Sequence, residues 1–376
     1  MVTGSKGVAH RLGGLADELP DDFLAAFQNA LVRWYKGQQR DLPWRRTRDP
    51  YAIWVSEIML QQTRVDQVMP YFLRFLEAFP TVHALASASL GQVLKVWEGL
   101  GYYARARNMH AAARQIVNEH GGRVPDSMKT ISALPGIGPY TAPAILSIAY
   151  DQDYAVVDGN VVRVLCRVFM IDQDPREGSI KHRLRQLAER LLPRGKASVF
   201  NQALMELGAL ACTPKTPSCE SCPLRTLCKA RTLGDPSSLP RRPAGTPKPH
   251  YQVTAGIIWK GDEILIAQRN PKGLLGSMWE FPGGKQEAGE SLEQCLRREV
   301  KEELDVEISI EHHLTTVRHT YTHFRITLHA FQCVYVTGEP KALGCADWRW
   351  VGVEELGGYP FARADQRILA AVLGAR

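Results

Sequence analysis

The sequence has 376 residues, of which 45% are hydrophobic, so we expect two or three domains that each bury a core without disulfides. The N-terminus has no apolar signal segment and no later stretch is long enough to span a membrane, which predicts an intracellular, cytoplasmic protein with no membrane partner. The net charge of +7 is uneven: residues 1–250 contain 32 Lys+Arg and 22 Asp+Glu, and residues 251–376 contain 14 and 17. The basic front part suits nucleic acid, although a charge this modest could serve solubility alone.

Helical periodicity runs through the first 228 residues. Asp21 and Asp22 open the first predicted helix, in which apolar side chains recur at helical spacing. Two helices follow within residues 51–79, a long amphipathic helix within 103–120, and two more within about 181–192 and 200–211. This part of the chain is therefore predicted to be all-α.

The segment 134–167, LPGIGPYTAPAILSIAYDQDYAVVDGNVVRVLCR, joins helices through a glycine turn. Gly136 and Gly138 flank one residue, so the backbone can turn tightly and direct its N–H groups outward, as a phosphate site requires. Pro139 fixes a helix start, and Asp158 is placed to cap the next helix. An ordinary structural interpretation stands beside this one, because such turns join many helices and Asp is a common N-cap residue.

After Cys228 the composition changes to Pro, Gly, Ser and basic residues, which predicts a linker over residues 229–250. From residue 252 the hydrophobic period becomes two, in VTAGIIW, EILIAQR and later FRITLHAFQCVYV. One helix is expected at 291–304 and another near the C-terminus. An α+β domain over 251–376 is therefore predicted to follow the all-α part.

Four cysteines follow one another closely as Cys212-x6-Cys219-x2-Cys222-x5-Cys228. In an intracellular chain this grouping favours metal ligands over disulfides. Four thiolates at this spacing can surround one compact centre, which on spacing alone is either zinc or an iron–sulfur cluster.

This cysteine pattern resembles the 4Fe-4S motif of the endonuclease III family of helix-hairpin-helix DNA glycosylases. LPGIGPYTA resembles the hairpin of that family, and WVSEIMLQQT, LPWR, GLGYYARARN and DGNVVRVLCR resemble its adenine DNA glycosylase branch, so the resemblance covers about residues 24–228. It implies a six-helix barrel at 51–154, a cluster domain built from 1–50 and 155–228, and a 4Fe-4S cofactor on the four cysteines.

The resemblance implies the catalytic residues Glu57, Asp158, Tyr140 and Asn160. Hydrolysis of an N-glycosidic bond needs two carboxyl groups with different roles. Glu57 would be protonated and donate to a flipped adenine, and Asp158 would be ionised and stabilise the oxocarbenium-like sugar. Tyr140 stands where bifunctional glycosylase/lyases carry a Schiff-base lysine, which implies a monofunctional enzyme. The alternative for Glu57 is a solvated glutamate on a helix surface.

The resemblance also implies a set of DNA contacts: Arg45, Gln61, Gln62, Tyr102, Gly136 and Gly138. Gln61, Gln62 and Tyr102 match wedge positions that support the duplex when a base leaves it, although packing at helix ends would also explain them. The two glycines would hold phosphate through backbone N–H groups and so bind without reading sequence. Pro143 departs from the glycine common in the family, at a position near the end of a first helical turn where a missing N–H is tolerated.

The C-terminal part resembles the Nudix fold, which the adenine glycosylase branch uses to recognise 8-oxoguanine opposite the target adenine. In the segment HTYTH, Tyr321, Thr322 and His323 stand at the Phe-Ser-His loop of that branch. The resemblance implies that they read the lesion as an aromatic wedge, a hydroxyl partner and a hydrogen-bonding ring. The alternative is an ordinary edge strand.

Residues 284–306 contain almost a complete Nudix box, in which Asp305 replaces the last glycine. Its helix has a predicted buried stripe of Leu292, Leu296, Val300 and Leu304. Glu299, Glu302 and Glu303 fall on another face, where they could bind magnesium or form a solvated acidic surface. Recognition domains of this branch are generally described as lacking hydrolase activity, so magnesium is the weaker alternative.

We therefore predict a multidomain protein that acts as a monomer on double-stranded DNA with 8-oxoguanine:adenine or guanine:adenine mispairs and removes the adenine during base excision repair. Three rival interpretations remain at this point. They are a glycosylase for pyrimidines or thymine mismatches, a Nudix hydrolase fused to a DNA-binding module, and a non-catalytic iron–sulfur DNA sensor.

Overall fold

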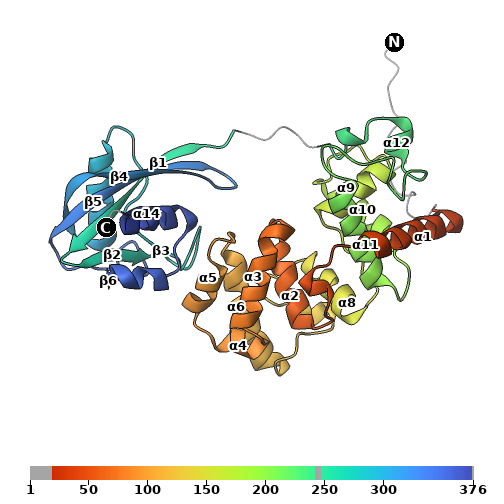
Figure 1. The fold of residues 1–376 in the computed structure, drawn as a ribbon, viewed down its shortest axis with the longest axis horizontal. Helices are drawn as coiled ribbons and strands as arrows, with labels where there is room; N and C mark the ends of the chain where they lie inside the picture. Colours follow the sequence, from red (N-terminus) through yellow and green to blue (C-terminus); the bar gives the residue numbers. More distant parts are fainter. Residues whose placement is uncertain (1–18, 242–246, 375–376) are drawn as a thin grey trace, which may run out of the picture. The chain divides into compact units, whose positions relative to one another are not determined.

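The computed structural model describes residues 19–241 and 247–374 (Figure 1). Residues 1–18 of the predicted N-terminal segment and residues 242–246 of the predicted linker lie outside the described residues. The chain divides into two compact units, one made of Met1–Gln62 with Glu119–Ala244 and the other of Thr63–Asn118 with Gly245–Arg376. None of the described helices combines the length and apolar character needed to cross a membrane.

The first unit is helical, as predicted from the sequence period. Its elements are α1 (Asp21–Gln38), η1 (Pro43–Arg45), α2 (Pro50–Leu60), α7 (Met128–Ile131), α8 (Thr141–Tyr150), α9 (Gly159–Val168), α10 (Gly178–Leu191), α11 (Ala197–Leu210), α12 (Lys229–Leu233) and η2 (Pro236–Ser238). The helix α11 packs against α1, α8 and α9, and α2 packs against α8 (Figure 1).

Apolar side chains at helical spacing build the core of this unit. Leu24, Phe27 and Leu31 of α1 are buried on one face of that helix. They join a cluster that includes Leu165 of α9 and Phe200 of α11. The helix α2 differs from α1, because every residue from Tyr51 to Met59 is buried. A helix that is apolar on all sides in this way belongs inside a protein, which is where α2 places its one carboxyl group.

The second unit combines a group of helices from residues 63–118 with a sheet and further helices from the C-terminal part. The helices are α3 (Val65–Ala78), α4 (Val82–Ser87), α5 (Leu90–Trp97) and α6 (Ala104–His120). The strands are β1 (His250–Lys260), β2 (Glu263–Gln268), β3 (Trp279–Glu280), β4 (Glu307–Thr320), β5 (Arg325–Thr337) and β6 (Asp347–Gly352). They are followed by η3 (Val353–Gly358) and α14 (Arg363–Gly374), and α13 (Leu292–Leu304) lies between β3 and β4.

The sheet has the order β3-β2-β1-β5-β4, with β6 also paired to β2. The strands β1 and β5 are parallel and the other pairs are antiparallel. The helix α13 packs on one face through Leu296, Val300 and Leu304, and the opposite face packs against α14 (Figure 1). The helix at 291–304 and its buried stripe are therefore confirmed. Ser291 and Gln294 form a capping box that defines where α13 begins.

The predicted linker begins later than the sequence indicated. Residues 229–241 form α12, η2 and the turns around them, and Ala230 and Leu239 are buried. The buried guanidinium of Arg167 donates to the Leu239 carbonyl at 3.0 Å. The prediction of a linker from residue 229 was wrong for this part, because two apolar residues among many polar ones are enough to hold the segment against α9.

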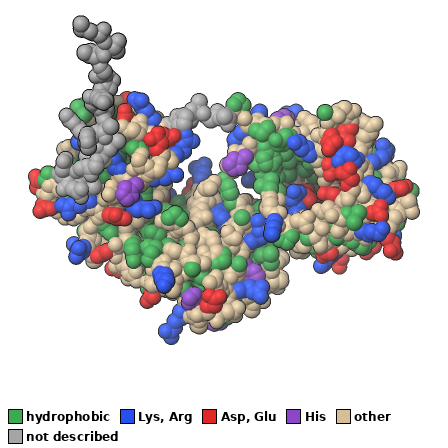
Figure 2. All heavy atoms as spheres, turned by 180° about the vertical axis from the view of Figure 1, so that it is seen from behind, with side chains coloured by type: hydrophobic (Ala, Val, Ile, Leu, Met, Phe, Trp, Pro, Cys, Tyr) green, Lys and Arg blue, Asp and Glu red, His purple; other side chains and the backbone are tan. Residues whose placement is uncertain are grey.

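Charged side chains of both signs are mixed on the face of the protein drawn in Figure 2. The net charge of +7 therefore does not gather into one large basic patch on that face. On that face, contact with a polyanion must depend on where particular cations lie.

Candidate active site

Glu57 lies in the buried middle of α2. Asp49 caps this helix by accepting from the N–H groups of Tyr51 and Ala52, and Pro50 occupies the first position. The Glu57 residue is only 4% exposed. The pKa of its carboxyl group is raised to about 7, because burial and the nearby charge of Asp158 outweigh the lowering by the Tyr140 hydrogen bond and by Arg45. The group can therefore hold a proton near neutral pH.

Tyr140 meets Glu57 from the start of α8. Its hydroxyl group donates to Oε2 of Glu57 at 2.9 Å. Burial and the two carboxyl groups of Glu57 and Asp158 raise the pKa of Tyr140 well above its ordinary value, so the phenol keeps its proton. A neutral hydroxyl at this position can orient the Glu57 carboxyl group but cannot form a Schiff base.

Asp158 caps α9, as the sequence predicted. Its Oδ1 accepts from the Val161 N–H at 2.7 Å, and its Oδ2 accepts from Nδ2 of Asn160 at 2.7 Å. Burial raises the pKa of this carboxyl group, while the hydrogen bonds from Val161 and Asn160 and the charge of Arg163 lower it. The position at a helix N-terminus also favours the anion. Asp158 therefore receives more stabilisation of its ionised form than Glu57 does.

Two residues behind Asp158 were missed in the sequence. Arg163 is buried and donates to Oδ1 of Asn160 at 2.9 Å, to the Gly208 carbonyl at 2.6 Å and to the Cys212 carbonyl at 2.7 Å. Gly208 of α11 lies so close to α9 that a Cβ atom on it would stand 2.6 Å from Cβ of Asn160. The sequence did contain a sign of the buried arginine, because Arg163 and Arg167 are two cations four residues apart in an otherwise apolar helix.

The four predicted cysteine ligands come together. Cys212, Cys219, Cys222 and Cys228 line one small cavity beside Arg167. The Arg167 guanidinium donates to Sγ of Cys212 at 3.2 Å. A cationic donor beside a sulfur is the kind of contact that stabilises a thiolate ligand. The described residues nevertheless contain no group of three His, Cys, Asp or Glu side chains placed to hold a single metal ion.

Arg45 forms a buried ion pair that the sequence did not suggest. Its guanidinium forms a two-point ion pair with buried Glu206, with N···O distances of 2.9 and 2.8 Å. Arg40 binds the same carboxylate, and the pKa of Glu206 falls to about 2 because these two arginines outweigh the effect of burial. The DNA contact expected of Arg45 stays a prediction, and its 13% exposed side chain is bound to Glu206.

The expected wedge residues have different environments. The Gln61 amide donates to Oγ1 of Thr141 at 2.9 Å and so ties the end of α2 to the start of α8. Gln62 is exposed with a φ of 57°, and Tyr102 in the second unit is 44% exposed with a φ of 50°. Non-glycine residues adopt positive φ rarely, which makes both positions candidates for contact with a ligand.

The glycine turn between α7 and α8 has the conformation that a phosphate site needs. Gly136 has a φ of 77°, which favours glycine. Among the described residues, no acceptor is found for the N–H groups of Gly136 and Gly138. Pro143 is the third residue of α8, where the N–H of any residue would lack a partner within the helix, so this departure is accommodated.

The segment 321–324 forms the turn between β4 and β5. The Tyr321 N–H donates to the Phe324 carbonyl at 2.8 Å, and the Tyr321 ring packs between His319 and Phe324 with centroid distances of 4.6 and 4.8 Å. Thr322 and His323 are exposed at the tip. The Thr322 hydroxyl lies 2.8 Å from the Tyr102 hydroxyl within the same unit. Tyr321 is therefore placed to support the turn rather than to project from it.

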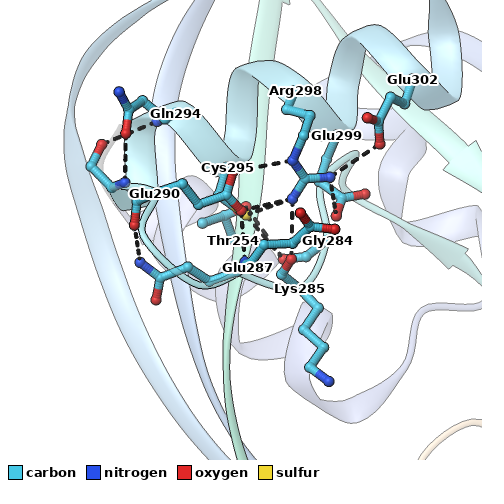
Figure 3. A network of polar contacts seen from close by, with 12 residues as sticks. Thr254, Gly284, Lys285, Glu287, Glu290, Gln294, Cys295, Arg298, Glu299 and Glu302 are labelled. Carbon is cyan, nitrogen blue, oxygen red and sulfur yellow. Dashed lines mark hydrogen bonds and ion pairs between the residues drawn. The ribbon is translucent and has the colours of Figure 1, made fainter.

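The Nudix box forms a network of ion pairs around Arg298 (Figure 3). Arg298 binds Glu290 at 2.7 Å, and Glu299 and Glu302 at 3.0 Å each. The pKa of nearby Glu303 rises to about 8, first through burial and then through Glu280 and Glu299. Asp305 has a φ of 58° at the end of α13, which explains why a glycine would also suit this position.

Comparison with known proteins assigns two parts of the chain to known families. Residues 55–190 match the HhH-GPD superfamily of base excision DNA repair proteins, and residues 254–371 match the NUDIX domain family. The chain is 37% identical to the adenine DNA glycosylase of Rattus norvegicus over 88% of this chain and 75% of that protein. It is similar to a thermostable thymine-DNA glycosylase at 33% identity and a TM-score of 0.51, covering 56% of this chain and 96% of the other. An endonuclease III trapped on DNA shares the fold at 21% identity and a TM-score of 0.50, covering 57% and 98%.

Proposed function

The chain belongs to the adenine DNA glycosylase family, and on this basis we propose that it hydrolyses the N-glycosidic bond of adenine paired with 8-oxoguanine or guanine in double-stranded DNA. It is an adenine-specific DNA glycosylase of base excision repair. The observation that carries the proposed mechanism is the buried carboxyl group of Glu57, whose pKa of about 7 leaves it able to donate a proton.

In this mechanism Glu57 protonates a ring nitrogen of the extruded adenine, which makes the base a better leaving group. Loss of the base leaves positive charge on the sugar, and the Asp158 carboxylate stabilises it until a water molecule adds to the anomeric carbon and gives its proton to the Glu57 carboxylate. Asn160 and the Val161 N–H keep Asp158 ionised and oriented. Tyr140 holds the Glu57 carboxyl group through its hydroxyl. Because Tyr140 offers no amine, the product is an abasic site in an uncut strand.

The cysteine cavity supports a 4Fe-4S cluster as the resident cofactor. Cys212, Cys219, Cys222 and Cys228 would hold it, and Arg167 would donate to one of the ligand sulfurs. When bound, the cluster would fix the loop 212–228 as a folding element. Brown protein with iron–sulfur charge-transfer absorption, lost in Cys222→Ser and kept in the control Cys345→Ser, is the expected result. Colourless protein that contains zinc would contradict it.

For the lesion, we propose that Thr322 and His323 contact 8-oxoguanine and that Tyr321 holds their turn. Their exposure at the tip of the β4–β5 hairpin supports this, as does the contact between Thr322 and Tyr102, a proposed wedge residue. Gln62 would support the opened duplex from the first unit, and Gly136 and Gly138 would hold a phosphate.

The experiment that tests the function is single-turnover excision on a set of duplexes that differ at one pair. We expect rapid loss of adenine opposite 8-oxoguanine, none opposite thymine, and strand cleavage only after alkali. Glu57→Gln should lower the rate by at least 10²-fold while duplex binding persists, and Glu189→Gln, an exposed glutamate of α10, serves as the matched control. Activity on a thymine mismatch without activity on adenine opposite 8-oxoguanine would sink the proposal.

A further inference from the structure

One face of the C-terminal sheet is left uncovered beside the β4–β5 hairpin. Side chains on this face alternate along each strand, so Arg325, Thr327 and His329 of β5 lie on the same side as Phe331 and Cys333. The helix α13 covers Phe331 and Cys333. Nearer the hairpin α13 no longer covers β5, and Arg325 is exposed.

Neighbouring strands extend this uncovered surface. The register pairs Arg325 with His250 of β1 and with Thr320 of β4, and it pairs Thr327 with Arg318 of β4. The surface is hollowed into a cavity lined by His250, Gln252, Arg318, His319, Thr320, Arg325, Ile326, Thr327 and His329. We call this cavity the hairpin cavity.

The hairpin cavity is basic in a domain that is not. Residues 251–376 contain 14 Lys+Arg and 17 Asp+Glu, yet the charged side chains that line the cavity are two arginines and no carboxylate. In the described part of the chain, no ion pair involves Arg318 or Arg325, whereas Arg269, Arg298 and Arg349 of this domain each form one. Two exposed and unpaired guanidinium groups therefore face one hollow.

Hydrogen bonds hold the polar floor of the cavity in place. Nε2 of His250 lies 2.9 Å from Oγ1 of Thr327, and Nε2 of His329 lies 2.9 Å from Oε1 of Gln252. Arg318 and Arg325 stand diagonally across β4 and β5, which places their Cβ atoms roughly 7–8 Å apart. Both guanidinium groups can thus reach one short stretch of an anionic chain.

We propose that the hairpin cavity binds the phosphodiester backbone of the DNA strand next to the lesion, through Arg318 and Arg325. The proposal rests on the proposed function, because the same hairpin carries Thr322 and His323 at its tip. Charge complementarity favours DNA as the ligand of this cavity, because a duplex presents a row of phosphates and arginine binds phosphate oxygens through paired N–H donors. Such contacts fix the register of the hairpin on the duplex and read no sequence.

The test measures binding of the full-length protein to a duplex that carries 8-oxoguanine opposite a tetrahydrofuran abasic analogue, so that no catalysis is needed. Affinity is measured by fluorescence anisotropy at several salt concentrations. Arg318→Ala/Arg325→Ala should weaken binding about tenfold or more and reduce the slope of log affinity against log salt by about 1–2. Arg318→Lys/Arg325→Lys should recover most of the slope.

The control is Arg297→Ala/Lys272→Ala, which removes the same charge from exposed positions outside the cavity. An equal change of slope in the control would overturn the proposal, since only net charge would then matter. Calorimetry with inorganic pyrophosphate measures whether the cavity binds a small anion instead of the DNA backbone. Pyrophosphate binding that is lost in the double variant, with the DNA slope unchanged, would also overturn it. If the wild-type protein showed no preference for the lesion duplex, the proposed function would fail instead.

Discussion

Gly208 offers the sharpest test of how the active site is held. A Cβ atom at this position would stand 2.6 Å from Cβ of Asn160 and 3.0 Å from both Cα and the carbonyl oxygen of Asn160. Carbon atoms in contact prefer about 3.5–4.0 Å, so Gly208→Ala requires the start of α9 to move by roughly 1 Å. The obstruction is backbone as well as side chain, and a change of rotamer cannot relieve it.

This displacement reaches the chemistry through Asn160, whose amide binds Asp158 at 2.7 Å. A misplacement of about 1 Å in a catalytic group costs about 10²-fold in rate, which corresponds to about 2.7 kcal/mol of activation free energy. Overpacking should also lower the free energy of unfolding by about 1–3 kcal/mol, part of which alanine recovers through its higher helix propensity. We therefore expect a folded protein with a slow excision step.

Single-turnover excision of adenine opposite 8-oxoguanine measures the rate, and thermal unfolding measures the stability. Gly37→Ala is the matched control, because Gly37 lies in α1 and has nothing within 4 Å of an added Cβ. It should keep the wild-type rate. A Gly208→Ala protein that excises adenine within threefold of the wild-type rate would refute the reasoning that α11 positions Asp158 through Asn160.

Three further predictions follow from the charges. The excision rate should fall about tenfold per pH unit above pH 7, because Glu57 must hold its proton and its pKa is about 7, and it should fall again in acid, where Asp158 takes up a proton. A rate that rises above pH 7 in single-turnover assays would exclude Glu57 as the acid. The pKa of Glu206 is lowered from 4.5 to about 2, so this group adds about 3 kcal/mol to the free energy of unfolding above pH 4.5, and this contribution is lost toward pH 2. In urea unfolding, the free energy of unfolding of Glu206→Gln should therefore decrease less between pH 5 and pH 3 than that of the wild type. Arg298→Ala should lower the free energy of unfolding of the C-terminal domain by about 1–3 kcal/mol, because Glu290, Glu299 and Glu302 lose their shared partner. Thermal unfolding measures this loss. Recovery of stability on adding magnesium would reveal a cation site.

The sequence was most informative where short-range rules decide the structure. Asp158 caps α9 because an Asp before a helix satisfies its first N–H groups, which needs no knowledge of the fold. The stripe of Leu296, Val300 and Leu304 follows from a spacing of four residues. The cysteine group was found for the same reason, since a compact loop brings its thiols together whatever surrounds it.

Long-range burial was what the sequence could not supply. Arg45 looked available for DNA, but Glu206 lies 161 residues further along the chain and occupies it. Nothing local to LPWR predicts that ion pair. The linker was placed too early because composition describes a segment and not its neighbours. Leu239 is buried, and its carbonyl group accepts a hydrogen bond from the Arg167 guanidinium.

The different roles proposed for the carboxyl groups of Glu57 and Asp158 depend on hydrogen-bond donors more than on burial. Burial raises the pKa of both Glu57 and Asp158. Glu57 has one compensating hydrogen bond, from Tyr140, inside a helix whose other faces are apolar. Asp158 has the Val161 N–H, the Asn160 amide and a helix N-terminus. The helix that carries each carboxyl group therefore favours one protonation state. The apolar surroundings of α2 favour protonated Glu57, and the N-terminus of α9 favours ionised Asp158. Removing the Asn160 amide should accordingly raise the pKa of Asp158 and favour its protonated form, which can serve as the acid but cannot stabilise positive charge on the sugar.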